Sequence, residues 1–464
     1  MNLFQNSLPW TNEFISQFKQ EDLLKLFDTA SNVKQDQSLP ITHAMVLIYS
    51  KTHPPLNLEK FKCRQILVDW YLSIGKKSFA IDRFHDLVNL SQDKLEVTTK
   101  EFGINIIGYA RSMSGLGEDT RSMTRIIDKL GIPFCILSCR HVSDSIDYAE
   151  VQNEAFYPKY SVSVFCMNYI EFKKLTTIYQ SMDIFGYIIL QAPWELPELP
   201  KQLIPPENTI NEFWAISNFV ENVLVKAVVL NVHHIYPVVE KLNHELAFRK
   251  ISQKRVFSFL YIFDASSFIS RKNPIGVVIA FQNAFRNGQS VQLTLKISNP
   301  LDNSEFLALR HACNSDSRIK LMTEQFNNLE LSKLYDKSDC YVSLHRSEGF
   351  GRTIAEAALH KKPIIVTGWS GSCDIFPNNY KFFVDYTLVK LKSNDYPFSE
   401  GQHWAEPDLA CASKLILSVF DMDNEERQRV GLENFNFVTE RFSEATALQQ
   451  IKPLLASALR NRLQ

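Results

Sequence analysis

Two glutamates, Glu348 and Glu356, lie eight positions apart on either side of a glycine-bearing turn at residues 349–351. The turn follows a short apolar run at residues 340–344 and leads into a helical pattern over residues 352–360. The first N–H groups of a helix lack intrahelical partners and the helix dipole is positive there, so an anion fits well at this turn. A strand, a glycine turn and a helix therefore predict a phosphate-binding site bordered by two carboxylates.

The two carboxylates suggest what else the ligand carries. A carboxylate accepts hydrogen bonds from two neighbouring hydroxyls at once, so one glutamate suits a sugar and the other a ribose. The alternative is that Glu348 caps the helix and Glu356 is a solvated helix residue. The glycine turn between them favours a nucleotide sugar as the ligand, because glycine lets the backbone come close to it.

A basic pair, Arg271 and Lys272, follows the strand-like run 256–263 and precedes a predicted helix over residues 275–285. Taken alone, the pair would be surface charge. Together with the glutamate turn, we interpret these cations as partners of a diphosphate. Lys296, at the end of the next predicted strand, is an additional source of positive charge.

Residues 108–118 contain a second glycine-bearing segment between a strand and a helix, here predicted over residues 118–130. The segment half resembles a dinucleotide fingerprint. Its glycines, Gly115 and Gly117, come after a longer loop, however, and the second strand ends without the acidic residue that binds a ribose. An NAD-dependent oxidoreductase therefore stays an alternative function.

The chain divides into three parts by its pattern. Residues 1–98 have helical periodicity, with helices expected over 12–30 and 66–74, and form an accessory module. Residues 99–240 and 241–464 each alternate short apolar runs with amphipathic segments, which is typical of a parallel sheet. The strands expected in these two parts are 104–110, 133–138, 162–166, 184–190, 213–216, 227–230, 256–263, 292–297, 340–344 and 363–367. The sequence thus predicts an α/β protein with two Rossmann-like domains and a helical extension.

Composition excludes several classes of protein. Fifty basic and fifty-one acidic side chains give a net charge of -1, so no overall field attracts nucleic acid or an anionic membrane. No apolar run reaches the ~20 residues of a membrane-spanning helix, and the amino terminus does not resemble a secretion signal. We expect a cytoplasmic protein with at most peripheral membrane association, at the inner face.

Two patterns that suggest metal binding have simpler interpretations. The eight cysteines are scattered and do not form a cluster with metal-ligand spacing, so we expect buried, reduced thiols. Asp421 and Asp423 spell the Asp-x-Asp pattern of some metal sites, but acidic residues at a helix start explain them. Asp408 is similarly expected to cap a helix. The sequence predicts neither a metal site nor a cofactor.

Residues 343–351 together with Glu356 resemble the E-x7-E donor motif of retaining glycosyltransferase family 4, and the resemblance continues through residues 363–371. Segments around Trp194 and Trp214 resemble a bacterial subgroup of that family. The resemblance implies a GT-B fold, in which two Rossmann-like domains face a central cleft and the last helices pack back towards the N-terminal domain. It also implies a retaining hexosyltransferase that moves a sugar from a nucleotide-diphosphate sugar to a glycan or lipid-linked acceptor in surface polysaccharide assembly.

The resemblance also implies roles for single residues. Glu348 lies near the transferred sugar, Glu356 binds the ribose, and the backbone of Phe350 and Gly351 meets the sugar and the diphosphate. Arg352 stands where the family usually has an aliphatic residue, beside the sugar subsite.

Further implied positions lie outside the motif. Lys272 matches the second of two basic residues that the family usually places several residues apart. Gly115 and Gly117 belong to a flexible loop that closes over the donor phosphates. A non-catalytic GT-B scaffold is a further alternative to a transferase.

Overall fold

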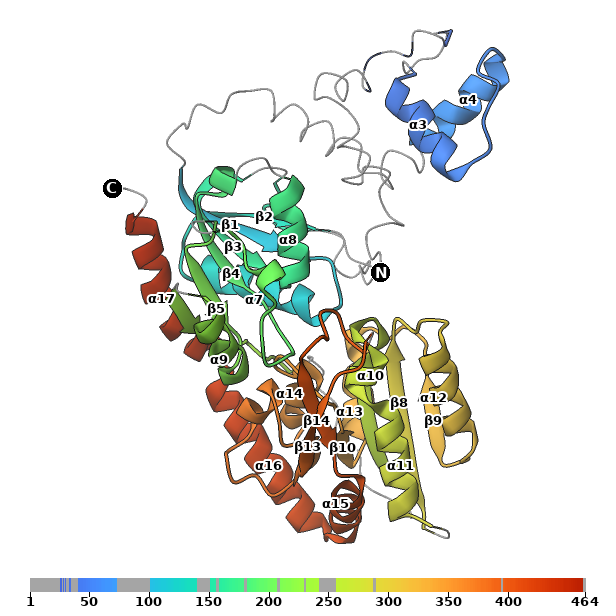
Figure 1. The fold of residues 1–464 in the computed structure, drawn as a ribbon, viewed down its shortest axis with the longest axis vertical. Helices are drawn as coiled ribbons and strands as arrows, with labels where there is room; N and C mark the ends of the chain where they lie inside the picture. The colour runs from blue at the N-terminus through green and yellow to red at the C-terminus, as the bar shows by residue number, and fades with distance from the viewer. Residues whose placement is uncertain are drawn as a thin grey trace.

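A computed structural model describes most of the chain in three parts (Figure 1). The residues described are 41–72, 101–139, 151–155, 158–178, 182–206, 209–228, 231–241, 256–286, 289–393 and 395–461, with a few positions between 26 and 34.

Within the described residues, the amino-terminal part contains two helices, α3 (His43–Thr52) and α4 (Phe61–Trp70), packed around a small core of their own. Thr42 caps α3, and the buried Arg64 of α4 donates to the carbonyls of Leu58 and Glu59 at 2.7 and 2.6 Å. The helix predicted over 12–30 lies largely outside the described residues. The one predicted over 66–74 begins earlier, at Phe61.

The first α/β part contains a six-stranded parallel sheet in the order β2-β1-β3-β4-β5-β6. Its strands are β1 (Glu101–Gly108), β2 (Phe134–Ser138), β3 (Tyr160–Cys166), β4 (Tyr187–Gln191), β5 (Glu212–Ala215) and β6 (Asn231–His234). Its helices are α7 (Gly115–Lys129), α8 (Tyr169–Ile178) and α9 (Asn218–Ala227), with short 3-10 turns η4 (Met182–Phe185) and η5 (Lys201–Leu203).

The strand predicted over 227–230 starts too early, because α9 extends through Ala227 and β6 is described from Asn231; residues 229–230 lie outside the described residues. Ser217 caps α9 by accepting from the Val220 N–H at 3.2 Å, and the helix buries Val220, Val223 and Leu224.

The second α/β part repeats the architecture, with strand order β12-β11-β10-β7-β8-β9. Its strands are β7 (Phe257–Asp264), β8 (Val291–Ser298), β9 (Ile319–Met322), β10 (Cys340–Ser343), β11 (Ile364–Thr367) and β12 (Phe383–Val384). Its helices are α10 (Ile269–Lys272), α11 (Pro274–Ala284), α12 (Ser304–Asn314), α13 (Asn328–Lys337), α14 (Arg352–Leu359), α15 (Leu409–Asp421) and α16 (Asn424–Arg441), with 3-10 turns η6 (Ala265–Ser267) and η7 (Gly371–Ile375). The predicted α/β class with two parallel sheets is confirmed.

The sequence patterns missed three features of this part: β9, β12 and an antiparallel hairpin of β13 (Tyr386–Lys390) and β14 (His403–Pro407). β12 is two residues long, and four of the five residues of β13 are exposed, so neither has a strong apolar signal. Both predicted helix caps are confirmed. Asp423 accepts from the Glu426 N–H at 2.8 Å, and Asp408 from the Ala410 N–H at 2.8 Å.

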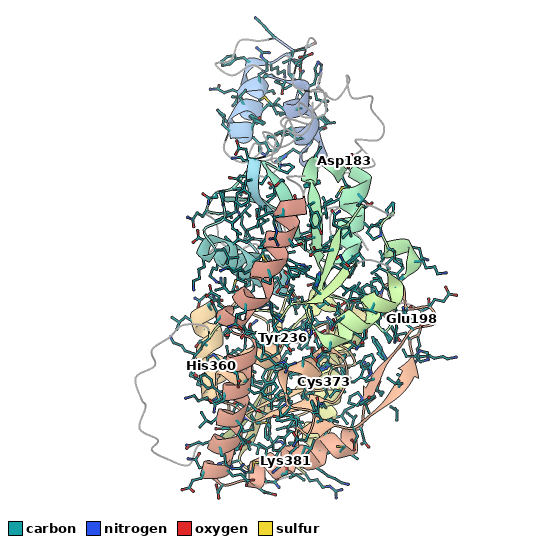
Figure 2. The ribbon with its side chains drawn as sticks, turned by 90° about the vertical axis from the view of Figure 1, so that its left-hand side faces the viewer. Asp183, Glu198, Tyr236, His360, Cys373 and Lys381 are labelled. Atoms are coloured by element: carbon teal, nitrogen blue, oxygen red, sulfur yellow. The ribbon has the colours of Figure 1, made fainter. Side chains whose placement is uncertain are left out.

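The last helix, α17 (Glu444–Asn461), returns to the first sheet, where it lies along the strands in Figure 1. Its apolar residues Ala447, Ile451 and Leu455 share a core with β1 and β3. Residues 235–241 form a crossing segment that leads from the first part towards the second. Tyr236, labelled mid-molecule in Figure 2, ties this segment to α17, because its N–H donates to the Gln450 side chain at 3.0 Å. The two sheets are therefore joined twice, through residues 235–241 and through α17.

Each sheet has a point where the strand order reverses, between β1 and β3 in the first and between β7 and β10 in the second. Open α/β sheets bind ligands in the crevice beyond the carboxyl ends of the strands at such a point. The candidate ligand-binding segments are therefore those that follow β7 and β10, and those that follow β1 and β3.

Candidate functional site

The segments after β7 and β10 are tied together at the reversal point of the second sheet. The Arg346 N–H donates to the Arg271 carbonyl at 2.8 Å, and the Arg271 guanidinium donates to the Ser347 carbonyl at 2.6 Å. Asn273, in a left-handed conformation with φ 51°, caps α11 and donates from Nδ2 to the Leu344 carbonyl at 2.9 Å. These bonds bring the predicted basic pair and the predicted glutamate turn into one site.

Glu348 lies between the two cations of this site. One carboxylate oxygen is 2.5 Å from Lys272 Nζ, and the other is 3.1 Å from Arg271 Nη1. The exposed fractions of the Glu348, Arg271 and Lys272 side chains are 10%, 3% and 14%, so the ion pairs are almost dry.

The charges in this site decide the protonation of its groups. Burial alone would raise the pKa of Glu348, but the charges of Lys272 and Arg271 outweigh it and lower the pKa to about 2. Burial and the neighbouring Arg271 lower the pKa of Lys272, against the opposing effect of Glu348. Glu348 is therefore a fixed negative charge held by two donors.

The backbone of Glu348 is held just as firmly by the segment after β11. The Glu348 N–H donates to Ser370 Oγ at 2.8 Å, and its carbonyl accepts from the Gly371 N–H at 2.9 Å. A Cβ at Gly371 would lie 2.0 Å from the Gly349 carbonyl oxygen, so glycine alone fits there without a backbone shift. Ser370 and Gly371 therefore orient the glutamate turn.

Glu356 lies one turn into α14 in a different environment. Its carboxylate accepts from the Tyr335 hydroxyl at 2.9 Å. Burial raises the pKa of Glu356 to about 7, although the bond from Tyr335 and the charge of Arg352 act in the opposite direction. This carboxylate titrates near neutral pH.

The turn between the glutamates, residues 349–351, is buried. The Phe350 ring is buried against Phe442, with ring centroids 5.1 Å apart. Gly351 has φ 98°, a conformation that favours glycine, and a Cβ there would lie 2.9 Å from Ile354 Cδ1. Any ligand contact from Phe350 and Gly351 is thus made through their peptide groups.

Arg352 points towards the first domain. Its guanidinium forms an ion pair with Asp119 of α7 and donates to the Val238 carbonyl at 3.0 Å. Its stem lies against Gly115, where an added Cβ would be 3.4 Å from Arg352 Cδ. The structure thus brings Arg352 and the first-domain glycines together.

The sequence suggested that Gly115 and Gly117 lie in a loop before the helix, but both lie inside α7. The helix begins earlier because Ser114 caps it and accepts from the Gly117 N–H at 3.3 Å. A Cβ at Gly117 would lie 2.0 Å from the Ser112 carbonyl oxygen. Gly117 is therefore required by the close packing of the preceding turn on the helix.

Lys296 is buried in β8, on the far side of β7 from β10. Its Nζ donates to the Ile297 carbonyl at 3.0 Å and lies 5.1 Å from the centroid of the Phe326 ring. Burial lowers the pKa of Lys296. Its recorded partners are thus separate from the Arg271, Lys272 and Glu348 cluster.

His345 lies within the motif range 343–351, where the sequence indicates no role for it. Its Nδ1 lies 3.0 Å from Ser343 Oγ and its Nε2 2.9 Å from Ser372 Oγ. Burial lowers its pKa to about 4, so the ring is neutral at physiological pH. His345 joins the strand end to η7 beneath Glu348, which its position in the motif alone did not reveal.

The hairpin supplies the other residues that sequence reasoning missed. Tyr396, between β13 and β14, donates to Glu195 of the first domain at 2.6 Å, and its ring centroid is 5.9 Å from the Arg271 guanidinium carbon. The Glu195 carboxylate is in turn 4.0 Å from Arg271. Because Tyr396 follows an exposed strand, the sequence carries no signal for this place.

The glutamate turn also contacts the first domain. Ser217 Oγ donates to the Gly349 carbonyl at 2.7 Å, and Ser347 donates to the Glu195 carbonyl. The carboxyl ends of both sheets thus meet around Glu348.

Structure comparisons agree with this two-sheet arrangement. A glycosyltransferase from Rickettsia africae has a TM-score of 0.56 at 15% identity, covering 78% of this chain and 99% of that chain. The N-terminal domain of Candida albicans trehalose-6-phosphate phosphatase has a TM-score of 0.50 at 10% identity, covering 79% of this chain and 98% of that chain. The fold is GT-B.

Similarity to TarM from S. aureus is weaker, with a TM-score of 0.48 at 13% identity, and it covers 63% of this chain and 55% of the TarM chain. Among curated proteins, none matches the sequence.

A family comparison singles out the second GT-B domain. Residues 260–390 match the family model described as Glycosyl transferases group 1. The matched segment begins in β7 and ends in β13, so it contains Arg271, Lys272, Glu348 and Glu356. No helix in the described part of the chain is both long and apolar enough to cross a membrane.

Proposed function

We propose that this chain is a retaining glycosyltransferase that moves a sugar from a nucleotide-diphosphate sugar to an acceptor hydroxyl. One observation carries the proposal: Glu348, Arg271 and Lys272 form a buried charge cluster at the strand-order reversal of the second sheet. The cluster lies inside the segment that matches the glycosyltransferase family model.

In the proposed reaction, the bond between the anomeric carbon and the diphosphate oxygen breaks while the acceptor oxygen bonds to that carbon. The acceptor attacks from the face that the diphosphate leaves, and its proton passes to a diphosphate oxygen. Negative charge grows on the leaving group, and preorganised donors stabilise such charge without reorganising. Arg271, Lys272 and the N–H groups at the start of α14 are the donors suited to this task.

The glutamates have separate roles in the proposal. Glu348, a fixed negative charge, positions the sugar and stabilises the positive charge that develops at its anomeric carbon. Glu356 binds the ribose hydroxyls, with Tyr335 orienting its carboxylate. Charge stabilisation by the protein's own cations suits a reaction without a metal.

The wider assignment follows the family resemblance. We propose a hexosyl donor, a glycan or lipid-linked acceptor, and a role in surface polysaccharide assembly inside the cell at the inner face of the membrane. TarM and the pneumococcal GtfA have been crystallised with UDP, and GtfA is described as an O-GlcNAc transferase. Thermal-shift screening across UDP-, GDP- and dTDP-sugars tests the donor class, because a bound ligand raises the apparent stability.

The catalytic assignment is tested by replacing Glu348 with Gln and measuring sugar transfer. The loss of a preorganised charge should lower kcat by about 10²- to 10³-fold. The double variant Glu348→Gln/Lys272→Met removes one charge of each sign and should be equally inactive while folding more readily. Undiminished transfer by either folded variant would refute the assignment.

A further inference from the structure

Arg352 is an unusual residue for the start of α14. It is the first residue of the helix, directly after Gly351, and a cation at a helix N-terminus opposes the helix dipole. The same end of α14 is where the proposed donor diphosphate would bring negative charge. An arginine here needs a partner that offsets its unfavourable position.

That partner comes from the other domain. The Arg352 side chain is 13% exposed and that of Asp119 is 10% exposed, and the two form a direct ion pair. Asp119 follows Glu118 of the first turn of α7, near the helix end where an acid is favoured by the helix dipole. The neighbouring Glu118 adds to the negative field, and the charge of Arg352 helps to lower the pKa of Glu118 against the effect of burial.

Three segments converge on this one guanidinium. They are the first turn of α7 with Gly115, the crossing segment at Val238, and the helix start that follows Gly351. The two ends of the ion pair therefore belong to the glycine segment and to the glutamate motif.

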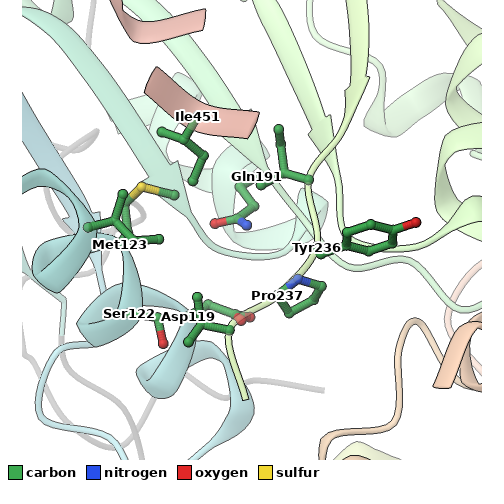
Figure 3. A pocket seen from close by; sticks show the side chains of 10 residues that line it. Asp119, Ser122, Met123, Gln191, Tyr236, Pro237 and Ile451 are labelled. Carbon is green, nitrogen blue, oxygen red and sulfur yellow. The ribbon is translucent and has the colours of Figure 1, made fainter. Parts of the chain in front are cut away.

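A small cavity lies next to the pair. It is lined by Asp119, Ser122 and Met123 of α7, by the segment 235–238 and Gln191, and by Ile451 of α17 (Figure 3). The cavity has a volume of about 10 Å³, room for about one water molecule, so the surroundings of Asp119 are closely packed.

We propose that Arg352 is a positioning residue for the proposed transfer, because its pair with Asp119 holds the glycine segment of α7 against the motif helix α14. This inference rests on the proposed function. The proposed donor contacts Arg271, Lys272 and Glu356 all lie in the second domain, so loss of the pair should leave donor binding nearly intact. The reacting geometry is lost, because α7 is no longer held over the donor.

The test uses Asp119→Asn and Arg352→Gln in the full chain, with Lys129→Met as the matched control. Lys129 is at the other end of α7 and pairs with Glu444 of α17 at 2.8 Å, away from the motif. We expect kcat to fall about 10- to 100-fold in the two test variants, since small misplacements cost rates of this order. The donor KM should change less than about threefold, and Lys129→Met should match the wild type.

Two further measurements separate positioning from a loss of folding. The charge-swapped variant Asp119→Arg/Arg352→Asp rebuilds an ion pair and should recover part of the lost kcat. Amide hydrogen exchange of residues 115–119 should speed up in Asp119→Asn and Arg352→Gln, but not in Lys129→Met.

Unchanged exchange and unchanged kcat in both test variants would overturn the inference, as would equal losses in the control. Faster exchange with unchanged kcat would mean that the ion pair holds α7 in place but does not position it for the reaction. Absence of transfer by the wild type would refute the proposed function and the positioning role with it, while the exchange of residues 115–119 would still decide whether the pair holds α7.

Discussion

The motif has a glutamate at each end, and the two carboxylates lie in opposite surroundings. Glu348, in the turn after β10, is paired with two buried cations that lower its pKa to about 2. Glu356, in α14, has a neutral phenol as its nearest partner, and burial raises its pKa to about 7. The difference shows that burial sets the direction of a carboxylate pKa shift only where no cation is close enough to outweigh it.

The comparison fits the division of labour that we propose. A carboxylate that must stabilise positive charge needs to be ionised throughout the working pH range, as Glu348 is. A carboxylate that binds ribose hydroxyls can work as a hydrogen-bonding group near its own pKa. Substitutions at the two glutamates and at their partners test this contrast.

The largest effect on stability is expected from Glu348→Gln. The change leaves Arg271 and Lys272 buried without their shared anion, and breaking such a pair costs about 3–5 kcal/mol. Urea unfolding monitored by the fluorescence of the tryptophans measures the loss. Glu348→Gln/Lys272→Met is the control, and a cost as large as that of the single variant would mean that pairing does not set the stability.

Glu356→Gln is expected to act in the opposite direction, stabilising the protein by about 1–3 kcal/mol at pH 8. The folded-state pKa of Glu356 is raised from 4.5 to about 7, so the folded state binds its proton more tightly. Wild-type stability from this group is therefore fully present below about pH 4.5 and is lost as the pH rises through about 7. Unfolding at pH 8 and pH 4.5 should give a gain only at pH 8; equal effects at both would refute the raised pKa.

The dependence of stability on pH below about 4.5 should report on Glu348. Its folded-state pKa is lowered from 4.5 to about 2, so its stabilising effect is present above about pH 4.5 and is lost as the pH falls towards 2. The stability difference between wild type and Glu348→Gln should shrink steadily over this range. A difference that stays constant below pH 4 would show that Glu348 is not held ionised.

Tyr335→Phe should have a smaller effect, confined to Glu356. The Tyr335 hydroxyl lowers the pKa of Glu356 by donating to it, so removing the hydroxyl should raise that pKa further above 7. Titration of the carboxyl ¹³C signal by NMR measures the change. A pKa that falls, or does not move, would contradict the bond between the two groups.

The smallest effect is expected from Ser370→Ala, which removes the acceptor for the Glu348 N–H. The loss of one hydrogen bond should cost about 1 kcal/mol, with the pKa of Glu348 still low because both cations remain. Unfolding of the variant checks the cost. A loss as large as that of Glu348→Gln would mean that the backbone, not the ion pairs, holds the turn.

Sequence reasoning went furthest where local pattern and spacing determine structure. The run 340–344, the turn 349–351 and the helix after it could be predicted because strand, glycine and helix signals follow one another directly. The closeness of Arg271 and Lys272 to Glu348 could be expected only through the parallel-sheet rule, since the residues are far apart in the chain. The ion pairs themselves required the structure.

What could not be predicted depends on contacts between domains. Arg352 stands out in sequence, but its partner Asp119 lies 233 residues away and belongs to the other sheet. Tyr396 and the hairpin around it gave no signal, because an exposed edge strand lacks the alternating pattern of a half-buried one. The pKa values of the two glutamates depend on neighbours that no spacing in the sequence identifies.

Calorimetric titration of nucleoside diphosphates is the most direct test of the proposed donor site between Glu348 and Glu356. The proteins to compare are the wild type, Lys272→Met and Glu356→Gln, with UDP, GDP, dTDP and NAD as ligands. We predict that at least one nucleoside diphosphate binds the wild type, that both variants weaken its binding about tenfold or more, and that NAD does not bind. Binding of NAD instead, or binding of a nucleoside diphosphate that neither substitution weakens, would contradict the account.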